Sequence, residues 1–258
     1  MRSNRSFAPV RDVRIATTFL TRIPVGWVQG MGVGDLSKAA WSFPIVGLVV
    51  GGIGGAALYG AAALDLHPLA CAFIGLAVMA LITGGLHEDG LADVADGFGG
   101  GGDKTRILEI MRDSRIGSFG VLALVFGIGI RAAALSGVPG PGLAWVTLIA
   151  AAILSRAVLP MLMAMMPAAR SDGLSKGAGQ PSMTGAFIAL ALGLVALFAL
   201  MPTNLAFVAI MVAIPLAGLI VLWAYRRLGG QTGDVLGAAQ QVIEMSVIIA
   251  AAGWSLSF

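Results

Sequence analysis

The chain contains few charged residues. Only 11% of its 258 amino acids are Asp, Glu, Lys or Arg, whereas a soluble domain carries about 25%. Hydrophobic residues make up 58%, and the mean hydropathy is +0.92. This composition excludes an ordinary soluble globular protein. It indicates an integral membrane protein, in which each spanning helix needs about 20 predominantly apolar residues.

Cysteine is nearly absent. The single residue, Cys71, lies in an apolar run, so one chain has neither a disulfide framework nor a cysteine-based metal site. A continuous basic tract for nucleic acid is also missing, although the net charge is +3. The Lys and Arg residues lie in short segments between apolar runs, which is typical of membrane orientation signals. We therefore expect a lipid bilayer and no nucleic acid as partner.

The apolar runs predict one domain, 1–258, built as an all-α transmembrane bundle of about seven spans, with a range of six to eight. Their approximate bounds are 41–64, 68–86, 117–136, 143–166, 184–201, 204–225 and 242–257. Basic residues occur only in alternate connections, which predicts a cytoplasmic N-terminus and, in this count, an external C-terminus. The last run is short, so a re-entrant segment is an alternative to a seventh span.

Residues 1–40 form a basic segment that is predicted to lie at the membrane surface. Arginines spread along it interrupt any cleavable signal peptide. Residues 7–28 are interpreted as amphipathic, with lipid-facing side chains from Phe19, Leu20, Ile23 and Trp27.

Small and charged residues inside the predicted spans indicate how the helices pack and which faces point inward. Gly47, Gly51 and Gly55 recur every four residues, which predicts close packing of one helix against another. Arg131 and Arg156 fall within predicted spans, where an unpaired charge is costly, so both are expected to face the bundle interior. Glu244 is a candidate partner for Arg156, and a contact with substrate is the alternative.

The residues suited to chemistry gather after the second span, in Thr83-Gly-Gly-Leu-His-Glu-Asp-Gly-Leu-Ala-Asp-Val-Ala-Asp-Gly97. This motif opens the connection 87–116. In a helix, Asp89, Asp93 and Asp96 would share one face. No Lys or Arg relieves their repulsion before Asp103, which favours a bound divalent cation. Hard oxygen ligands select Mg²⁺ or Mn²⁺, and Mg²⁺ usually completes its coordination with substrate phosphates.

Basic residues follow the acidic motif across four glycines, 99–102. Lys104, Arg106, Arg112 and Arg115, with Asp113 among them, are candidates for binding phosphate, because a guanidinium matches two phosphate oxygens. Membrane orientation is the alternative role for them. A third segment, 229–237, carries Thr232 and Asp234, which are suited to cap a helix, and backbone N–H groups that suit an anion. An acidic site facing a basic cluster predicts phosphoryl transfer at a diphosphate.

Five sequence blocks resemble the cobalamin synthase family. They are Thr21-Arg-Ile-Pro-Val25, Phe43-Pro-Ile-Val-Gly-Leu48, the motif 83–97, Met111-Arg-Asp-Ser-Arg-Ile-Gly117 and Gly229-Gly-Gln-Thr-Gly-Asp-Val-Leu-Gly-Ala238. They occur in order along nearly the whole chain, which makes the resemblance specific. It implies an enzyme of the bacterial inner membrane, with a cytoplasmic active site, that joins adenosylcobinamide-GDP to α-ribazole or its 5′-phosphate. GMP is released, and Mg²⁺ is required.

The resemblance also implies roles for individual residues. Asp89, Asp93 and Asp96 are expected to be catalytic and to bind the metal. His87 matches the family pattern and is a further catalytic candidate. Glu88 stands at a position that varies in the family and is a further candidate for the metal. The substrate-binding candidates are Lys104, Arg112, Asp113, Arg115, Gln231, Thr232 and Asp234. Which carboxylate holds metal and which accepts a proton is left open.

Two other functional classes are weighed against this one. CDP-alcohol phosphatidyltransferases also place spaced aspartates beside a span, in the pattern D-x-x-D-G-x-x-A-R and then G-x-x-x-D-x-x-x-D. The sequence after Asp89 lacks the Ala-Arg pair and the second half of that pattern. A transporter or channel would place its carboxylates near the middle of spans, whereas most of those here lie at one end. A homo-oligomer is compatible with the sequence.

Overall fold

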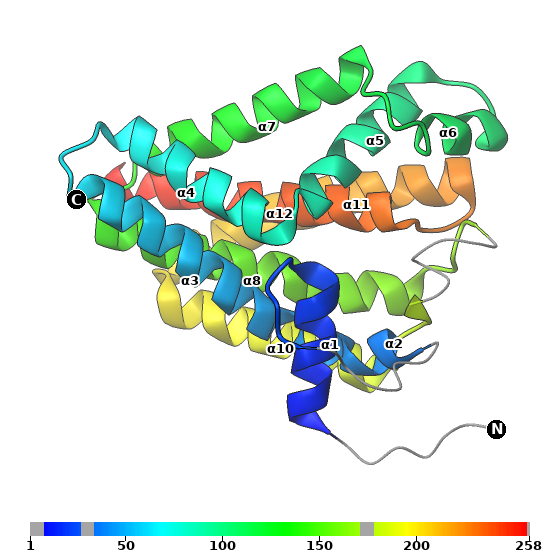
Figure 1. Cartoon of the computed structure of the whole chain (residues 1–258), viewed down its shortest axis with the longest axis horizontal. Coiled ribbons are helices and arrows are strands. Elements are labelled where there is room, and N and C mark those ends of the chain that lie inside the picture. Colours follow the sequence, from blue (N-terminus) through cyan, green and yellow to red (C-terminus); the bar gives the residue numbers. More distant parts are fainter. Residues whose placement is uncertain (1–7, 27–33, 171–177, 257–258) are drawn as a thin grey trace.

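The computed structural model describes residues 8–26, 34–170 and 178–256 (Figure 1). These residues contain no strand, and Ala168 and Gln231 form one isolated bridge. The helices are α1 (Pro9–Leu20), α2 (Asp35–Ala39), η1 (Ala40–Ser42), α3 (Phe43–Ala62), α4 (Pro68–Thr83), α5 (Leu86–Gly100), α6 (Lys104–Ile110), α7 (Ser118–Ser136), α8 (Pro141–Met165), α10 (Met183–Leu200), α11 (Thr203–Leu228), α12 (Gly233–Ala252) and η2 (Gly253–Leu256). The all-α prediction is confirmed.

Six helical stretches of the described chain are long and apolar enough to cross a membrane. They are Asp35–Ala62, which joins α2, η1 and α3, and the helices α7, α8, α10, α11 and α12. The pair α4 and α5 adds a seventh if the two form one bent span. Six to seven spans agree with the predicted bundle.

The second predicted span is shorter than its apolar run. α4 ends at Thr83, because Gly84 and Gly85 both adopt a left-handed backbone, with φ of 67° and 69°, which glycine takes without strain. α5 then continues at 91° to α4. The acidic motif is therefore a helix of its own. The connection 87–116 is therefore helical over most of its length, in α5 and α6.

The last helix begins earlier than predicted. α12 starts at Gly233 rather than at residue 242, because Thr232 caps it: the Oγ1 atom of Thr232 accepts a hydrogen bond from the backbone N–H of Val235 at 3.2 Å. Its side chains are largely buried, and it packs against α5, α7, α8 and α11. α12 is thus a central helix long enough to span a membrane, whereas the predicted run was short.

α1 runs crosswise to the long helices and packs on α2 and α3 (Figure 1). Its amphipathic pattern is real, but Ile15, Ala16 and Leu20 are buried by protein. The prediction that Leu20 faces lipid is therefore wrong. Phe19, which was assigned to the same face, is half-buried and lines the pockets described below. Trp27 lies outside the described residues.

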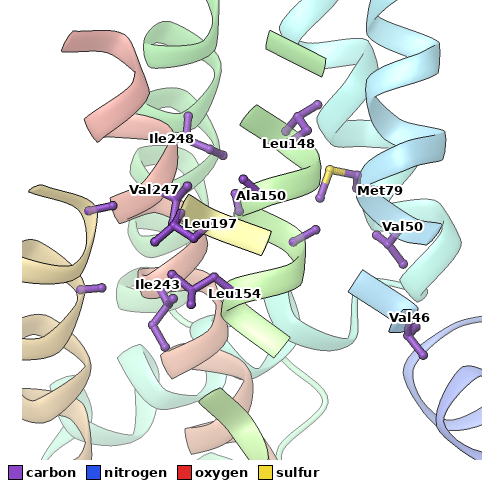
Figure 2. Close-up of a cluster of buried hydrophobic side chains, with 14 of the residues drawn as sticks. Val46, Val50, Met79, Leu148, Ala150, Leu154, Leu197, Ile243, Val247 and Ile248 are labelled. Carbon is purple, nitrogen blue, oxygen red and sulfur yellow. The ribbon is translucent and has the colours of Figure 1, made fainter. Parts of the chain in front are cut away.

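The core joins α3, α4, α8, α10 and α12. Figure 2 shows its buried side chains, which include Val46, Val50, Met79, Leu148, Ala150, Leu154, Leu197, Ile243, Val247 and Ile248. The glycines of α3 permit this packing. A Cβ atom on Gly47 or Gly51 would collide with the backbone of α8, and one on Gly55 would collide with Trp145. The predicted role of these glycines in helix packing is confirmed.

Candidate active site

A pocket of about 810 Å³ lies between α1, α5 and the segment that joins α6 to α7. We call it the carboxylate pocket. α5 contributes Asp89 and Asp93, the connecting segment contributes Arg112 and Ser114, and Arg22 enters from the end of α1. The acidic motif and one arginine of the basic cluster therefore meet in one cavity.

Asp89 and Asp93 lie one helical turn apart on α5 and line the same wall. Neither carboxylate accepts a hydrogen bond from the part of the chain that the structure describes. Asp93 is repelled by Asp89, Asp234 and Asp96 and attracted by Arg170. The two carboxylates thus present oxygens on this wall that remain available to a ligand.

Asp96 has a different environment, although it is only three residues from Asp93. Its Oδ2 atom accepts a hydrogen bond from the backbone N–H of Gly117 at 2.7 Å, and its Oδ1 atom accepts one from Gly120 at 2.8 Å. These donors form the N-terminus of α7, where a negative charge is favourable. A Cβ atom on either glycine would collide with the carboxylate. Asp96 therefore joins α5 to α7 and is absent from the lining of the carboxylate pocket.

Glu88 points into the bundle. Its Oε1 atom accepts a hydrogen bond from Gln241 at 3.1 Å and lies 3.7 Å from Arg131. Arg131 in turn pairs with Glu244 at 2.8 Å, and Arg156 pairs with the other oxygen of Glu244 at 3.2 Å. This buried network links α5, α7, α8 and α12. It confirms that both arginines face the interior and that Arg156 reaches Glu244.

His87 is also directed inward. Its side chain is buried and lines a second cavity of about 140 Å³, which we call the apolar pocket. Neither ring nitrogen has a hydrogen-bond partner among the described residues. His87 is not part of the lining of the carboxylate pocket. The structure thus separates it from Asp93, which lines only the larger cavity.

The basic cluster is divided in a similar way. Arg112 lines the carboxylate pocket. Arg115 is exposed and forms a 2.7 Å ion pair with Asp113, whose pKa is lowered from 3.8 to about 2 chiefly by the hydrogen bond from that guanidinium. Lys104 is exposed at the start of α6, near Gly229. Of the four predicted phosphate-binding cations, only Arg112 lines the carboxylate pocket, and Asp113, which was also predicted to bind substrate, lines it too.

The segment before α12 approaches α5 closely. A Cβ atom on Gly90 would collide with the backbone of Asp234, so glycine permits this approach. Asp234 lines the apolar pocket and lies 3.5 Å from Arg170. Thr232 caps α12, which is one of its two predicted roles. The other, substrate binding, stays a prediction. Gln231 is buried, and its backbone pairs with residues 167 and 169.

Arg22 and Arg170 were not among the predicted site residues. The backbone N–H of Arg22 donates to Ile82 at 2.7 Å, which brings the end of α1 to the bend between α4 and α5. The sequence could have indicated Arg22 as a site residue, because Arg22 lies in the first of the five sequence blocks. Arg170 lies in the connection 167–183, where a single arginine resembles an orientation marker and carries no pattern that predicts a contact with Asp234.

Comparison with known proteins identifies the family of the chain. The family model for cobalamin-5-phosphate synthase matches residues 12–252. The chain belongs to this family. It is 44% identical to the adenosylcobinamide-GDP ribazoletransferase of Bradyrhizobium diazoefficiens over 96% of this chain and 95% of that protein. It is 43% identical to the protein of the same name in Azorhizobium caulinodans over 96% and 97% of the two chains. No solved structure gives a significant match.

The cobalamin-5-phosphate synthase family covers all five sequence blocks, because its model begins before Thr21 and ends after Ala238. The resemblance to that family is confirmed. The CDP-alcohol phosphatidyltransferase alternative is not favoured, since the curated relatives carry the ribazoletransferase name instead.

Proposed function

We propose that the chain transfers the cobinamide phosphate of adenosylcobinamide-GDP to α-ribazole or α-ribazole 5′-phosphate and releases GMP. The names of its relatives and one observation support this. In the carboxylate pocket, Asp89 and Asp93 have no hydrogen-bond partner in the described chain, and they share the cavity with Arg22 and Arg112. Oxygen ligands opposed by guanidinium groups suit a diphosphate.

The same carboxylates fit the Mg²⁺ ion that we propose as cofactor. Mg²⁺ prefers hard oxygen ligands and often takes one or two protein carboxylates together with substrate phosphates. Asp89 and Asp93 supply this set on adjacent turns of α5. Asp96 and Glu88 are weaker candidates, since their oxygens already accept protein hydrogen bonds. When bound, the ion would neutralise charge on the diphosphate and on the transferring phosphoryl group.

The reaction is a displacement at the phosphorus attached to cobinamide. A ribose hydroxyl of α-ribazole forms a new P–O bond, and the bond from that phosphorus to the bridging oxygen of the diphosphate breaks. GMP leaves with the bridging oxygen. Asp89 lines both pockets and is placed to accept the hydroxyl proton. Arg22 and Arg112 bind and orient the diphosphate oxygens.

We place the carboxylate pocket on the cytoplasmic side of the bacterial inner membrane. The loop between α6 and α7 that lines it carries Arg112 and Arg115, whereas the turn between α7 and α8 carries no Lys or Arg. A reporter fused after Gly101 should therefore be cytoplasmic, and one fused after Pro139 should be periplasmic. The opposite result at Gly101 would contradict this orientation.

The activity is tested directly with purified protein. Mixing it with adenosylcobinamide-GDP, α-ribazole and Mg²⁺ should release GMP in step with formation of adenosylcobalamin. Reactions without α-ribazole control for hydrolysis, and reactions with EDTA test the metal. GMP release that does not depend on α-ribazole would mean a diphosphate hydrolase and would contradict the transferase function.

A further inference from the structure

The apolar pocket adjoins the carboxylate pocket. Phe19, Leu86 and Asp89 line both cavities, so the two meet beside the proposed catalytic carboxylate. The rest of its wall comes from α1, α3, α8 and α12 and is mainly aliphatic or aromatic. It includes Leu20, Phe43, Leu159, Met163 and Leu236.

His87 is the exception in this apolar wall. The side chain is 2% exposed, yet neither Nδ1 nor Nε2 has a hydrogen-bond partner among the described residues. Buried polar groups are nearly always hydrogen-bonded, because burial without a partner is costly. Asp234, the other polar side chain here besides Asp89, already has Arg170 at 3.5 Å. An unpartnered ring in the wall of a cavity points to a ligand with one complementary polar atom.

We propose that the apolar pocket binds the heteroaromatic base of α-ribazole. This assignment rests on the transferase function proposed above. The base is a benzimidazole with one ring nitrogen bonded to ribose and the other free to accept a hydrogen bond. A ring N–H of His87 donates to that free nitrogen, and the fused carbocycle lies among Phe19, Leu159 and Leu236.

The dimensions and polarity of the pocket favour this occupant over the other parts of the substrates. Its volume is about 140 Å³, and an apolar cavity of about 150 Å³ holds one benzene ring, so the pocket takes the carbocycle of the base while the remainder extends toward the carboxylate pocket. A corrin macrocycle is far larger. Guanine has several acceptors along its edges, and among the described lining residues only the His87 side chain could donate to them. With the base in this pocket, the ribose lies near Asp89, where a hydroxyl faces the carboxylate pocket.

The hydrogen bond is tested by binding, without turnover. Equilibrium dialysis of the purified full-length protein would compare α-ribazole with an analogue whose base has a carbon in place of the free nitrogen. Wild type should bind α-ribazole about tenfold to a hundredfold more tightly than the analogue. In His87→Phe the preference for α-ribazole should be lost, mainly through weaker binding of α-ribazole. An equal loss for both ligands would overturn the hydrogen bond.

The cavity itself is tested by filling it. Leu236→Phe should raise the KM for α-ribazole about tenfold and leave the KM for adenosylcobinamide-GDP within about twofold, because the base and not the diphosphate is displaced. Leu66→Phe is the matched control, since Leu66 lines a separate cavity with Cys71 and Val138. Leu236→Phe also provides the test of the pocket if His87→Phe does not fold.

The outcomes separate the base pocket from the transferase function. Binding that depends on His87 without GMP release would retain the base pocket and contradict the transferase. GMP release with an unchanged KM for α-ribazole in His87→Phe and Leu236→Phe would retain the transferase and overturn the pocket. Absence of both binding and GMP release would overturn both. Displacement of a copurified lipid acyl chain by Leu236→Phe, with α-ribazole binding intact, would assign the cavity to lipid instead.

Discussion

Two groups of carboxylates in this protein differ in what their oxygens contact. Glu244 is 1% exposed, and its two oxygens meet Arg131 and Arg156. Asp89 and Asp93 line an open cavity and accept no hydrogen bond from the described chain. A buried carboxylate with a complete set of partners holds helices together, whereas a carboxylate without partners is available to a ligand.

The same division runs through α5 itself. Asp93 faces the carboxylate pocket, while Asp96, three residues later, binds two backbone N–H groups of α7. Glu88 turns to the interior, and Asp89 faces both cavities. Since helix position decides the partner, the four acidic residues of the motif are not equivalent. Only Asp89 and Asp93 keep oxygens without a hydrogen-bond partner in the described chain.

Replacing the carboxylates of the pocket should have the largest effect on activity. In Asp89→Asn or Asp93→Asn, loss of a charged ligand should lower GMP release by about 10³-fold or more, about 4 kcal/mol of transition-state stabilisation. The thermal midpoint of the purified protein should hardly change. Glu109→Gln is the control, because this carboxylate is exposed and pairs only with Arg106 in the described contacts. Turnover within tenfold of wild type in both variants would contradict the metal site.

Replacing the buried carboxylate should instead affect stability. Glu244→Gln leaves Arg131 and Arg156 without their shared anion, which typically costs about 3–5 kcal/mol. We expect a lower thermal midpoint in detergent and less monodisperse protein. Glu88→Gln is the matched comparison and should cost less, because Glu88 lies 3.7 Å from Arg131 rather than in direct contact. If Glu244→Gln unfolds at the wild-type temperature, the network does not hold α7, α8 and α12 together.

Asp96 tests the division within one helix. An Asn side chain retains only one oxygen acceptor, so Asp96→Asn should lose one of the two hydrogen bonds to α7, at a cost of about 1–3 kcal/mol. Stability should fall moderately, and the Mg²⁺ concentration for half-maximal activity should stay near the wild-type value. In Asp93→Asn the residual activity should need more Mg²⁺. A large rise in the Mg²⁺ requirement of Asp96→Asn would return Asp96 to the metal site.

Much of the fold was predictable because lipid imposes simple rules. Long apolar runs identified the spanning helices, and the cost of an unpaired charge correctly predicted that Arg131 and Arg156 face inward. The start of α12 was missed for a related reason. Gln240, Gln241 and Glu244 reduce the apolar character of its first half, but they are buried and bonded to one another or to arginine. Hydropathy does not distinguish an interior polar network from a connection.

The site was predictable in residue type but not in arrangement. Spacing placed Asp89, Asp93 and Asp96 on one face of a helix, yet the donors that bind Asp96 lie 21 and 24 residues further along the chain. No local pattern reveals such a contact. The bend at Gly84 was equally hidden, because the apolar run continues to Leu86. That bend turns the acidic helix by 91° from α4 and brings it beside Arg22.

The smallest effect on turnover is expected for substitution of Arg115. This prediction extends the comparison from the carboxylates to the arginines. Arg112 lines the carboxylate pocket, whereas Arg115 is paired with Asp113 on the surface. Arg112→Lys should lower turnover about a hundredfold, because a point charge does not replace a two-pronged contact with phosphate.

Arg115→Lys should remain within about twofold of wild type, because exposed ion pairs contribute little and lysine preserves the orientation signal. Turnover at saturating adenosylcobinamide-GDP would be measured for both variants in parallel. Equal losses would mean that α6 and its following segment move so that both arginines reach the diphosphate. Unchanged turnover in both would leave Arg22 and the metal to neutralise it.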